Sequence, residues 1–252
     1  MSRLFDSHFH IIDDCYPLVP NQGYTPKSFT AHDYLTQLAS YQLEGGAIVS
    51  GSFHGFDQSY LIAALKQLGG SYVGVAQLPF DISDEAILSL HELGVRAVRF
   101  NLRRDCVGDI SQVERFARHV WALCGWHAEF YVGAEALTSL ENTLATLPKV
   151  VIDHLGLERA GCATLSRLIE RGVYVKATGF GRLNFNAIPF MQRLYHINSE
   201  ALMFGTDLPS TRAPIPFGEA DIQAIHAAFD DEAMRRIMWQ NAVSLYRPRN
   251  LI

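Results

Sequence analysis

Short apolar runs alternate with longer amphipathic stretches along the chain. The apolar runs are rich in Val, Ile and aromatic residues, which is typical of buried parallel strands. Eight such runs occupy residues 4–10, 46–52, 72–78, 97–102, 128–133, 150–154, 173–178 and 202–205. Helical patterns lie between most of them, at 60–68, 83–93, 111–123, 137–147 and 164–170. This alternation predicts an α/β fold, a (β/α)8 TIM barrel of regular or distorted shape, in a single domain over residues 1–252.

Polar residues mark the ends of several predicted strands. In a (β/α)8 barrel the active site is at the C-terminal ends of the strands, so these residues are the candidates for function. His8 and His10 are two residues apart and project to the same face of the first strand. His154 ends the sixth run and Asp207 follows the eighth. We therefore predict a catalytic site of three imidazoles and one carboxylate at the mouth of the barrel.

Arginines and hydroxyl groups form a second set of polar residues near the same strand ends. Planar guanidinium groups match carboxylates in bidentate geometry, so several arginines at one mouth predict a small anionic substrate. Tyrosine and serine hydroxyls add hydrogen-bond donors. Arg103 is an alternative to one of the arginines, Arg104. The predicted substrate-binding residues are Arg99, Arg104, Arg182, Tyr24, Ser52 and Tyr131.

Composition narrows the class of protein. The formal net charge is −5 and no run of Lys or Arg is present, which argues against nucleic acid as a partner. No segment approaches the ~18 apolar residues of a membrane span, so we expect a cytoplasmic protein that does not contact membranes. The cysteines are dispersed without close pairs, which predicts free thiols in or near the core: Cys15, Cys106, Cys124 and Cys162.

The chain contains the motifs Asp6-Ser7-His8-Phe9-His10, Asp153-His154-Leu155-Gly156, Gly205-Thr206-Asp207-Leu208-Pro209 and Asn241-Ala242-Val243-Ser244-Leu245-Tyr246. Together they resemble the amidohydrolase superfamily, and more narrowly its group of 2-pyrone-4,6-dicarboxylate lactonase and sugar lactonases. The resemblance implies hydrolysis of a cyclic ester, with Asp207 as the general base that activates water and later protonates the leaving oxygen. It also implies that the histidines polarise the carbonyl, and that Arg99 and Arg182 contact substrate carboxylates.

The metal requirement depends on the fourth and fifth strands. Many metal-dependent amidohydrolases carry a carboxylated Lys, a Glu or a His at the end of one of them. Here the fourth strand ends in Arg99-Phe100-Asn101 and the fifth has no His at its end. This is similar to the pyrone lactonase, which works without a metal, so no cofactor is favoured. One zinc or manganese ion remains the alternative, with His8, His10, His154 and Asp207 as its ligands.

Other functions stay open at this stage. The segments 179–182 and 205–210 depart from the pyrone lactonase pattern, so a sugar lactone or a smaller carboxylated lactone is an alternative substrate. A metal-dependent decarboxylase of an aromatic or unsaturated acid is a further alternative within the superfamily. A serine hydrolase built on Ser52 and His54 lacks an acid to orient the histidine. Retention of the three histidines and Asp207 argues against a barrel that only binds. The oligomeric state is open.

Overall fold

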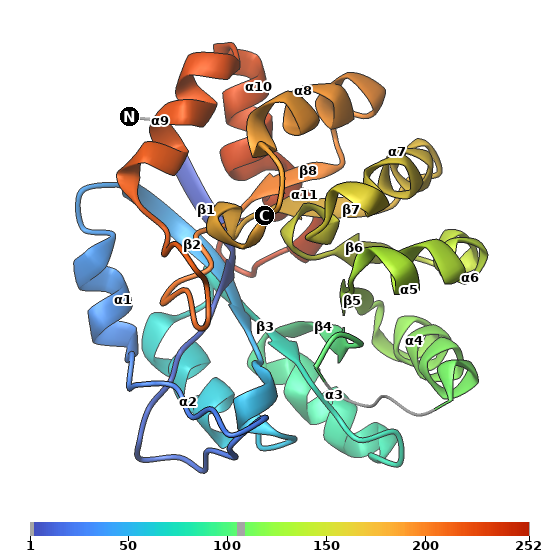
Figure 1. The fold of residues 1–252 in the computed structure, drawn as a ribbon. Coiled ribbons are helices and arrows are strands. Elements are labelled where there is room, and N and C mark those ends of the chain that lie inside the picture. The colour runs from blue at the N-terminus through green and yellow to red at the C-terminus, as the bar shows by residue number, and fades with distance from the viewer. Residues whose placement is uncertain (1–2, 105–108, 252) are drawn as a thin grey trace.

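Eight parallel strands form the centre of the protein. The computed structural model describes residues 3–104 and 109–251, and in this part of the chain the strands follow one another around a single sheet in the order β1 to β8 (Figure 1). The strands are β1 (Arg3–Phe9), β2 (Gln42–Val49), β3 (Tyr72–Ala76), β4 (Val95–Asn101), β5 (His127–Tyr131), β6 (Val150–Ile152), β7 (Tyr174–Ala177) and β8 (Leu202–Phe204). The predicted (β/α)8 barrel is confirmed.

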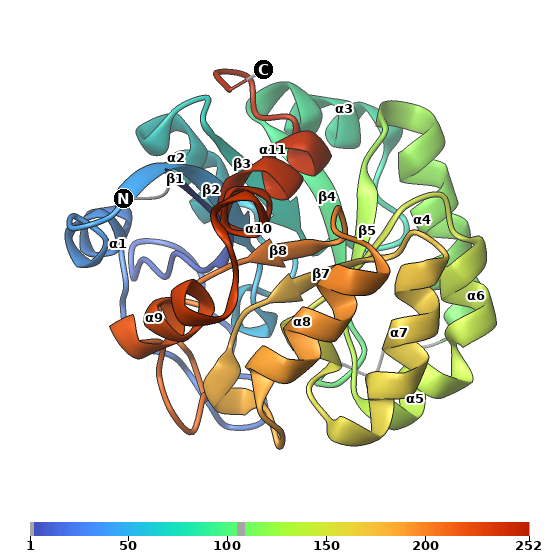
Figure 2. The ribbon, with the colours of Figure 1, turned by 90° about the horizontal axis from the view of Figure 1, so that it is seen from above.

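Helices cover the outside of this sheet, and α7 and α8 lie side by side there (Figures 1 and 2). The α-helices are α1 (Ala31–Gln37), α2 (Ser59–Leu68), α3 (Asp84–Leu93), α4 (Ile110–Cys124), α5 (Ala134–Ser139), α6 (Glu141–Thr146), α7 (Cys162–Glu170), α8 (Ala187–Ile197), α9 (Glu219–Ala228), α10 (Asp231–Arg235) and α11 (Asn241–Tyr246). Short helical turns are η1 (Ser52–His54), η2 (His154–Gly156), η3 (Arg159–Gly161), η4 (Phe180–Arg182) and η5 (Arg236–Gln240).

Some predicted boundaries were wrong. The predicted helix over residues 137–147 is two short helices, α5 and α6. The strand predicted to begin at residue 46 begins at Gln42, because its polar first half pairs with β1 from Arg3 onward. Helix α8, which contains Pro189 in its first turn, was not predicted. Proline is tolerated there because the first backbone N–H groups of a helix have no partner within it.

The first and last strands meet through a few strong contacts. The backbone N–H of His10 donates to Leu208 O, and that of Asp207 donates to His8 O, each at 2.7 Å. The buried Asp6 carboxylate accepts hydrogen bonds from the backbone and the hydroxyl of Thr206, at 2.8 and 2.6 Å. Gly205 permits this approach, since a Cβ there would lie 2.7 Å from the His8 nitrogen. The barrel is therefore nearly closed between β8 and β1.

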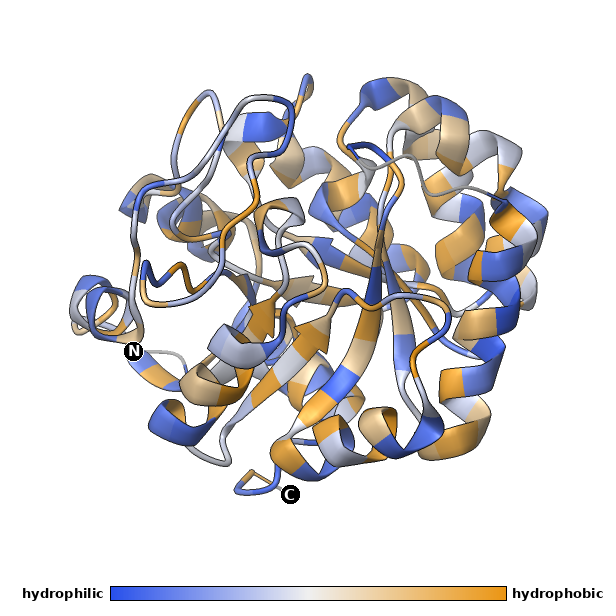
Figure 3. Cartoon of the chain, turned by 90° about the horizontal axis from the view of Figure 1, so that it is seen from below, coloured by the Kyte–Doolittle hydropathy of each residue, from blue (hydrophilic) through white to orange (hydrophobic). Residues whose placement is uncertain are grey.

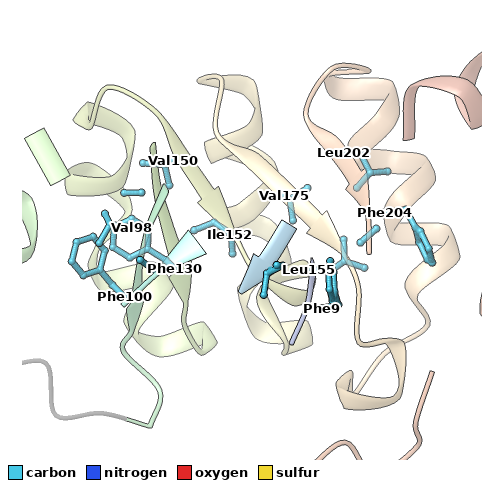
Figure 4. Packing of buried hydrophobic residues seen from close by; sticks show 14 of the residues in the cluster. Phe9, Val98, Phe100, Phe130, Val150, Ile152, Leu155, Val175, Leu202 and Phe204 are labelled. Carbon is cyan, nitrogen blue, oxygen red and sulfur yellow. The ribbon is translucent and has the colours of Figure 1, made fainter. Parts of the chain in front are cut away.

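Two apolar clusters hold the barrel together. The larger lies between the strands and the helices, and Figure 4 shows part of it, including Val98, Phe130 and Phe204. The smaller joins inward-facing residues of the strands to α11, including Val75 and Tyr246. Figure 3 shows mainly apolar strands within helices that carry both apolar and polar residues. Because side chains alternate along a strand, the inward positions not filled by this smaller cluster are free for polar groups.

The described cysteines are free thiols. Cys124 and Cys162 are half-buried, whereas Cys15 is exposed. The expectation that all of them are in or near the core was therefore wrong for Cys15, which is in the loop between β1 and α1. Cys106 is outside the described residues. Across residues 3–104 and 109–251, no helix has the length and apolar character needed to cross a bilayer.

Candidate active site

The four predicted catalytic residues come together at one end of the barrel. His8 is in β1, His10 follows it, His154 begins η2 after β6, and Asp207 follows β8. All four side chains are buried. The His8 ring centroid is 5.1 Å from that of His10 and 4.8 Å from that of His154. Asp207 Oδ1 is 3.9 Å from His8 Nε2 and 4.0 Å from His10 Nε2. The strand ends thus bring together residues up to 199 positions apart in sequence, counting from 8 to 207.

The backbone at two of these residues is in an uncommon conformation. His154 has φ +50° and Asp207 has φ +62°. For a residue with a Cβ, this left-handed region costs about 1–3 kcal/mol of conformational free energy. Residues held in this region cluster at functional sites. Both are held by their neighbours, since Asp207 donates its backbone N–H to His8 and the carbonyl of His154 accepts from Leu157 at 2.8 Å. The fold therefore stabilises the two strained positions that carry the predicted chemistry.

The histidines of the site are neutral. Burial lowers the pKa of His8, and lowers those of His10 and His154 well below the ordinary value. His10 Nδ1 is 2.7 Å from the carbonyl oxygen of Val49, which can only accept, so Nδ1 carries the proton. The neutral His10 ring therefore presents the lone pair of Nε2 towards Asp207. A lone pair in this position can accept a hydrogen bond from a water molecule.

Arg182 holds one oxygen of Asp207. Its Nε donates to Asp207 Oδ2 at 2.6 Å, and its Nη2 donates to the carbonyl of Thr211 at 2.7 Å. Gly179 packs against this arrangement, because a Cβ at that position would lie 2.8 Å from His154 Nδ1 and 3.1 Å from Asp207 Oδ2. Asp207 Oδ1 is left directed at the histidines. Arg182 was predicted to bind substrate, and the structure places its guanidinium group on the Asp207 carboxylate.

Three buried atoms of the site have no hydrogen-bond partner within the described parts of the chain. They are His8 Nε2, His154 Nδ1 and Asp207 Oδ1. His8, His154 and Asp207 each offer one ligand atom, and these atoms lie within 4.8 Å of one another. Two imidazoles and a carboxylate at this spacing fit one divalent ion such as zinc. The same three residues could instead bind water and the reacting carbonyl group through their unpartnered atoms.

A pocket opens above these residues and brings the predicted substrate-binding residues together. Tyr24, Ser52 and Tyr131 all line it. Arg99 also lines it, but its Nε and Nη2 donate to Asp153 Oδ2 at 3.1 and 2.9 Å. All six predicted residues line the pocket, namely Arg99, Arg104, Arg182, Tyr24, Ser52 and Tyr131. The two arginines assigned by resemblance are thus the two that already bind carboxylates of the protein.

Two other arginines of the pocket have charges that no carboxylate balances in the part of the chain described. Arg104 Nη2 is 3.5 Å from the Tyr131 hydroxyl, and Arg212 stacks over the Tyr24 ring at 4.4 Å. Neither forms an ion pair with a described residue. Arg103 instead pairs with Glu158 at 2.6 Å, so Arg104 is the one of this neighbouring pair that lines the pocket. Arg212, from the segment after β8, also lines the pocket.

The His54 ring is held by contacts within the protein, which exclude it as a general base for Ser52. Its ring stacks on Tyr60 at 3.6 Å, its Nδ1 accepts from Gly51 N–H, and its Nε2 donates to Ile11 O. Both ring nitrogens are therefore occupied in the neutral form. Burial lowers the pKa of His54 to about 3.

This lowered pKa predicts that stability depends on pH. Below the ordinary pKa of about 6.5, the unfolded chain binds a proton at His54 that the folded chain does not. The free energy of unfolding should fall by about 1.4 kcal/mol per pH unit from this group as pH drops from 6.5 towards 3. Urea unfolding of the parent and His54→Phe between pH 7 and 5 measures it. The variant should show a shallower slope, and equal slopes would contradict the prediction.

A buried ion pair lies below the site, and it was not predicted from the sequence. Lys176 of β7 and Glu129 of β5 form an ion pair, and neither side chain is exposed. Glu129 also accepts from His127 Nε2 at 3.0 Å and from the hydroxyl of Tyr246 in α11. The sequence carried a signal, because each charge stands inside an apolar strand run. Opposite charges in buried strands require partners, and here they are partners of each other.

The chain resembles known proteins over nearly all of its length. The sequence profile of the amidohydrolase family matches residues 5–247. A 2-pyrone-4,6-dicarboxylate hydrolase of Comamonas testosteroni is 25% identical over 277 residues, covering 98% of this chain and 90% of the relative. Two solved structures agree in fold. A probable 2-pyrone-4,6-dicarboxylic acid hydrolase of Acinetobacter baumannii, with citric acid bound, has a TM-score of 0.85 at 23% identity, covering 97% of this chain and 99% of that one. A candidate hydrolase of the same acid from Pseudomonas putida has a TM-score of 0.83 at 27% identity, covering 99% of each chain.

Proposed function

Because this chain belongs to the amidohydrolase family, and because a relative matched over nearly its full length is a 2-pyrone-4,6-dicarboxylate hydrolase, we propose that it is an enzyme that hydrolyses a carboxylated lactone. The substrate is 2-pyrone-4,6-dicarboxylate or a lactone of similar size and charge, and Asp207 is the general base. One observation carries this proposal. Asp207 Oδ1 has no hydrogen-bond partner among the described residues and faces His8 and His10 below a pocket lined by arginines.

The reaction begins with water. Asp207 Oδ1 accepts one proton of a water molecule, and His10 Nε2 accepts a hydrogen bond that orients it. The water oxygen forms a bond to the lactone carbonyl carbon as its proton moves to Asp207, and the carbonyl electrons move to oxygen. The ring C–O bond of this tetrahedral intermediate then breaks. Asp207 returns its proton to the departing ring oxygen, which yields an open-chain acid and leaves the enzyme unchanged.

The pocket favours an anionic substrate. Arg104 and Arg212 present guanidinium groups that form no ion pair with any residue in the described ranges. A carboxylate bound between them would form charge-assisted hydrogen bonds, which are among the strongest in proteins. The citric acid bound to the A. baumannii relative is likewise a small polycarboxylate. We propose that Arg104 and Arg212, with Tyr24 and Tyr131 beside them, bind the carboxylates of the lactone.

A metal ion is compatible with the residues present. His8, His154 and Asp207 would hold it, since their ligand atoms lie within 4.8 Å of one another. When bound, a divalent ion would act as a Lewis acid on the carbonyl oxygen. The general-base chemistry of Asp207 does not require it, so we propose that the enzyme works without a metal cofactor.

The test is a panel of lactones assayed with and without a chelator, together with elemental analysis of the protein. We expect hydrolysis of 2-pyrone-4,6-dicarboxylate or a related carboxylated lactone, without stoichiometric metal and without loss on chelation. Activity only on sugar lactones would overturn the substrate class. Tightly bound zinc or manganese, chelator-sensitive turnover and decarboxylation of an aromatic or unsaturated acid would replace the proposal with the decarboxylase alternative.

Arg212 gives a sharper test of the substrate class. Replacing it with Ala should raise KM for a carboxylated lactone by about 10- to 100-fold, because a charge-assisted hydrogen bond contributes roughly 1.5–3 kcal/mol. The KM for an uncharged lactone should change little. Steady-state kinetics on the two lactones measures this, with Arg103→Ala as the matched control because Arg103 pairs with Glu158. An equal effect of Arg212→Ala on both lactones would contradict the prediction.

A further inference from the structure

We propose that Lys176 is a positioning residue that fixes the tautomer of His8, so that His8 presents an Nε2–H donor to the substrate carbonyl oxygen. The assignment of the oxyanion donor rests on the proposed hydrolytic function. The assignment of the tautomer does not, because it follows from contacts within the protein.

Lys176 is a buried cation with three acceptors around it. Its Nζ donates to Glu129, lies 3.3 Å from His8 Nδ1 and lies 3.6 Å from Asp153 Oδ1. Lys176, Glu129 and Asp153 have no exposed side-chain surface. A charge in such a position is retained only when it is paired, and the two carboxylates pair it. An ammonium group has three donors and no lone pair, so the nitrogen it approaches on His8 must be an acceptor.

The other neighbour of His8 Nδ1 is Asp153, and it does not accept a hydrogen bond from that nitrogen. Asp153 Oδ1 is 3.4 Å from His8 Nδ1 but forms no hydrogen bond with it, whereas Lys176 Nζ, at 3.3 Å, does. That oxygen has no hydrogen-bond partner among the residues of the described chain. Asp153 Oδ2 is occupied by Arg99. Asp153 therefore balances the charge of Lys176 without taking a proton from the His8 ring.

The far end of the ring supports the same tautomer. His8 Nε2 is buried and faces Asp207 Oδ1 at 3.9 Å. A lone pair on Nε2 would repel that carboxylate, whereas an N–H is attracted to it. His10 and Asp207 both present acceptors to the site, so His8 supplies the donor that a developing oxyanion requires. A neutral ring with its proton on Nε2 also has no lone pair there for a metal ion.

The parent protein alone provides the first test. In protein labelled with 15N-histidine, long-range 1H–15N correlation spectra near neutral pH distinguish the protonated from the unprotonated ring nitrogen. The His8 signals are assigned as those missing from His8→Gln. We expect a protonated Nε2 and an unprotonated Nδ1. A protonated Nδ1 would overturn the proposal, and so would an Nε2 bound to a metal ion in metal-loaded protein.

Lys176→Met provides the second test, with Tyr246→Phe as its matched control. Lys176→Met removes the donor to Nδ1, so the His8 proton should move to Nδ1 and kcat should fall about 100-fold, as for loss of one oxyanion donor. Tyr246→Phe removes a donor to Glu129 in the same buried cluster but keeps Lys176. It should leave the His8 spectrum unchanged. Parent-like His8 signals in a folded Lys176→Met would overturn the role of Lys176.

The two proposals fail separately. If the parent shows Nε2–H on His8 but hydrolyses no lactone, the proposed function fails and the tautomer assignment stands. If it hydrolyses lactones with the proton on Nδ1, the function stands and the Lys176 proposal fails. Should Lys176→Met not fold, the spectrum of the parent still decides the tautomer.

Discussion

Replacing Asp207 with Asn should lower kcat by about 10³-fold, within the 10²- to 10⁴-fold range of general acid–base catalysis, and should leave substrate affinity within a few-fold of the parent. The amide oxygen can still accept from Arg182, which holds Oδ2 of the native carboxylate at 2.6 Å. The amide nitrogen that replaces Oδ1 cannot accept the proton of water. Steady-state kinetics on the best lactone, with calorimetric measurement of ligand binding, tests both parts.

Glu158→Gln is the matched control for this change. It replaces a carboxylate by an amide near the same mouth, in a residue that pairs with Arg103 and not with any of the proposed catalytic groups. We expect its kcat to equal that of the parent. If Asp207→Asn turns over lactones as fast as the parent, Asp207 is not the base. If Asp207→Asn loses both a bound metal and its activity, Asp207 is a metal ligand.

Replacing Arg99 with Met should destabilise the protein by about 3–5 kcal/mol, the usual effect of removing one partner of a buried ion pair. Arg99 donates twice to Asp153 and once to the Ser50 carbonyl, at 2.9 Å. Burial alone would raise the pKa of the Asp153 carboxyl. The positive charges around Asp153, that of Arg99 first, instead hold this pKa well below its ordinary value. Without Arg99 the buried carboxylate loses its bidentate partner. Urea unfolding at neutral pH measures the change.

Arg104→Met distinguishes a structural arginine from one that binds substrate. Arg104 forms no ion pair with a described residue, so its loss should change the free energy of unfolding by less than about 1 kcal/mol while raising KM for a carboxylated lactone.

In Arg99→Met, adding Asp153→Leu should restore part of the lost stability, because it removes the unpaired charge. Parent-like stability in Arg99→Met together with a raised KM would show that Arg99 acts mainly on substrate.

The sequence predicted the barrel and the meeting of His8, His10, His154 and Asp207 because both follow from alternation along the strands and from one general rule of barrel folds. Apolar strand runs and the spacing of His8 and His10 depend only on alternation along a strand. The position of Asp207 follows from the rule that strand ends meet at one face of a barrel. These features need no knowledge of which side chain contacts which.

The pairing of charges could not be predicted in the same way. The three arginines near the strand ends look alike in sequence, yet Arg99 binds Asp153 and Arg182 binds Asp207, whereas Arg104 forms no ion pair with a described residue. Whether an arginine is satisfied by the protein or is available to a ligand depends on distances across the barrel, which sequence spacing does not give. The same holds for Lys176, whose partners lie in β1, in β5 and directly after β6. Glu129 and Lys176 could have been identified as buried charges, but not their contact with His8.

The contacts between β1 and β8 constrain the order in which the enzyme becomes active during its synthesis. Asp6 emerges from the ribosome early, but its partner Thr206 follows 200 residues later. His8 and His10 likewise precede Asp207 by most of the chain, and Tyr246 is added later still. A nascent chain that has completed seven strands therefore exposes the Asp6 edge of β1 and lacks Asp207, the proposed general base. Activity should appear only after β8 and α11 leave the exit tunnel, and the unpaired first strand is the segment that most needs protection until then.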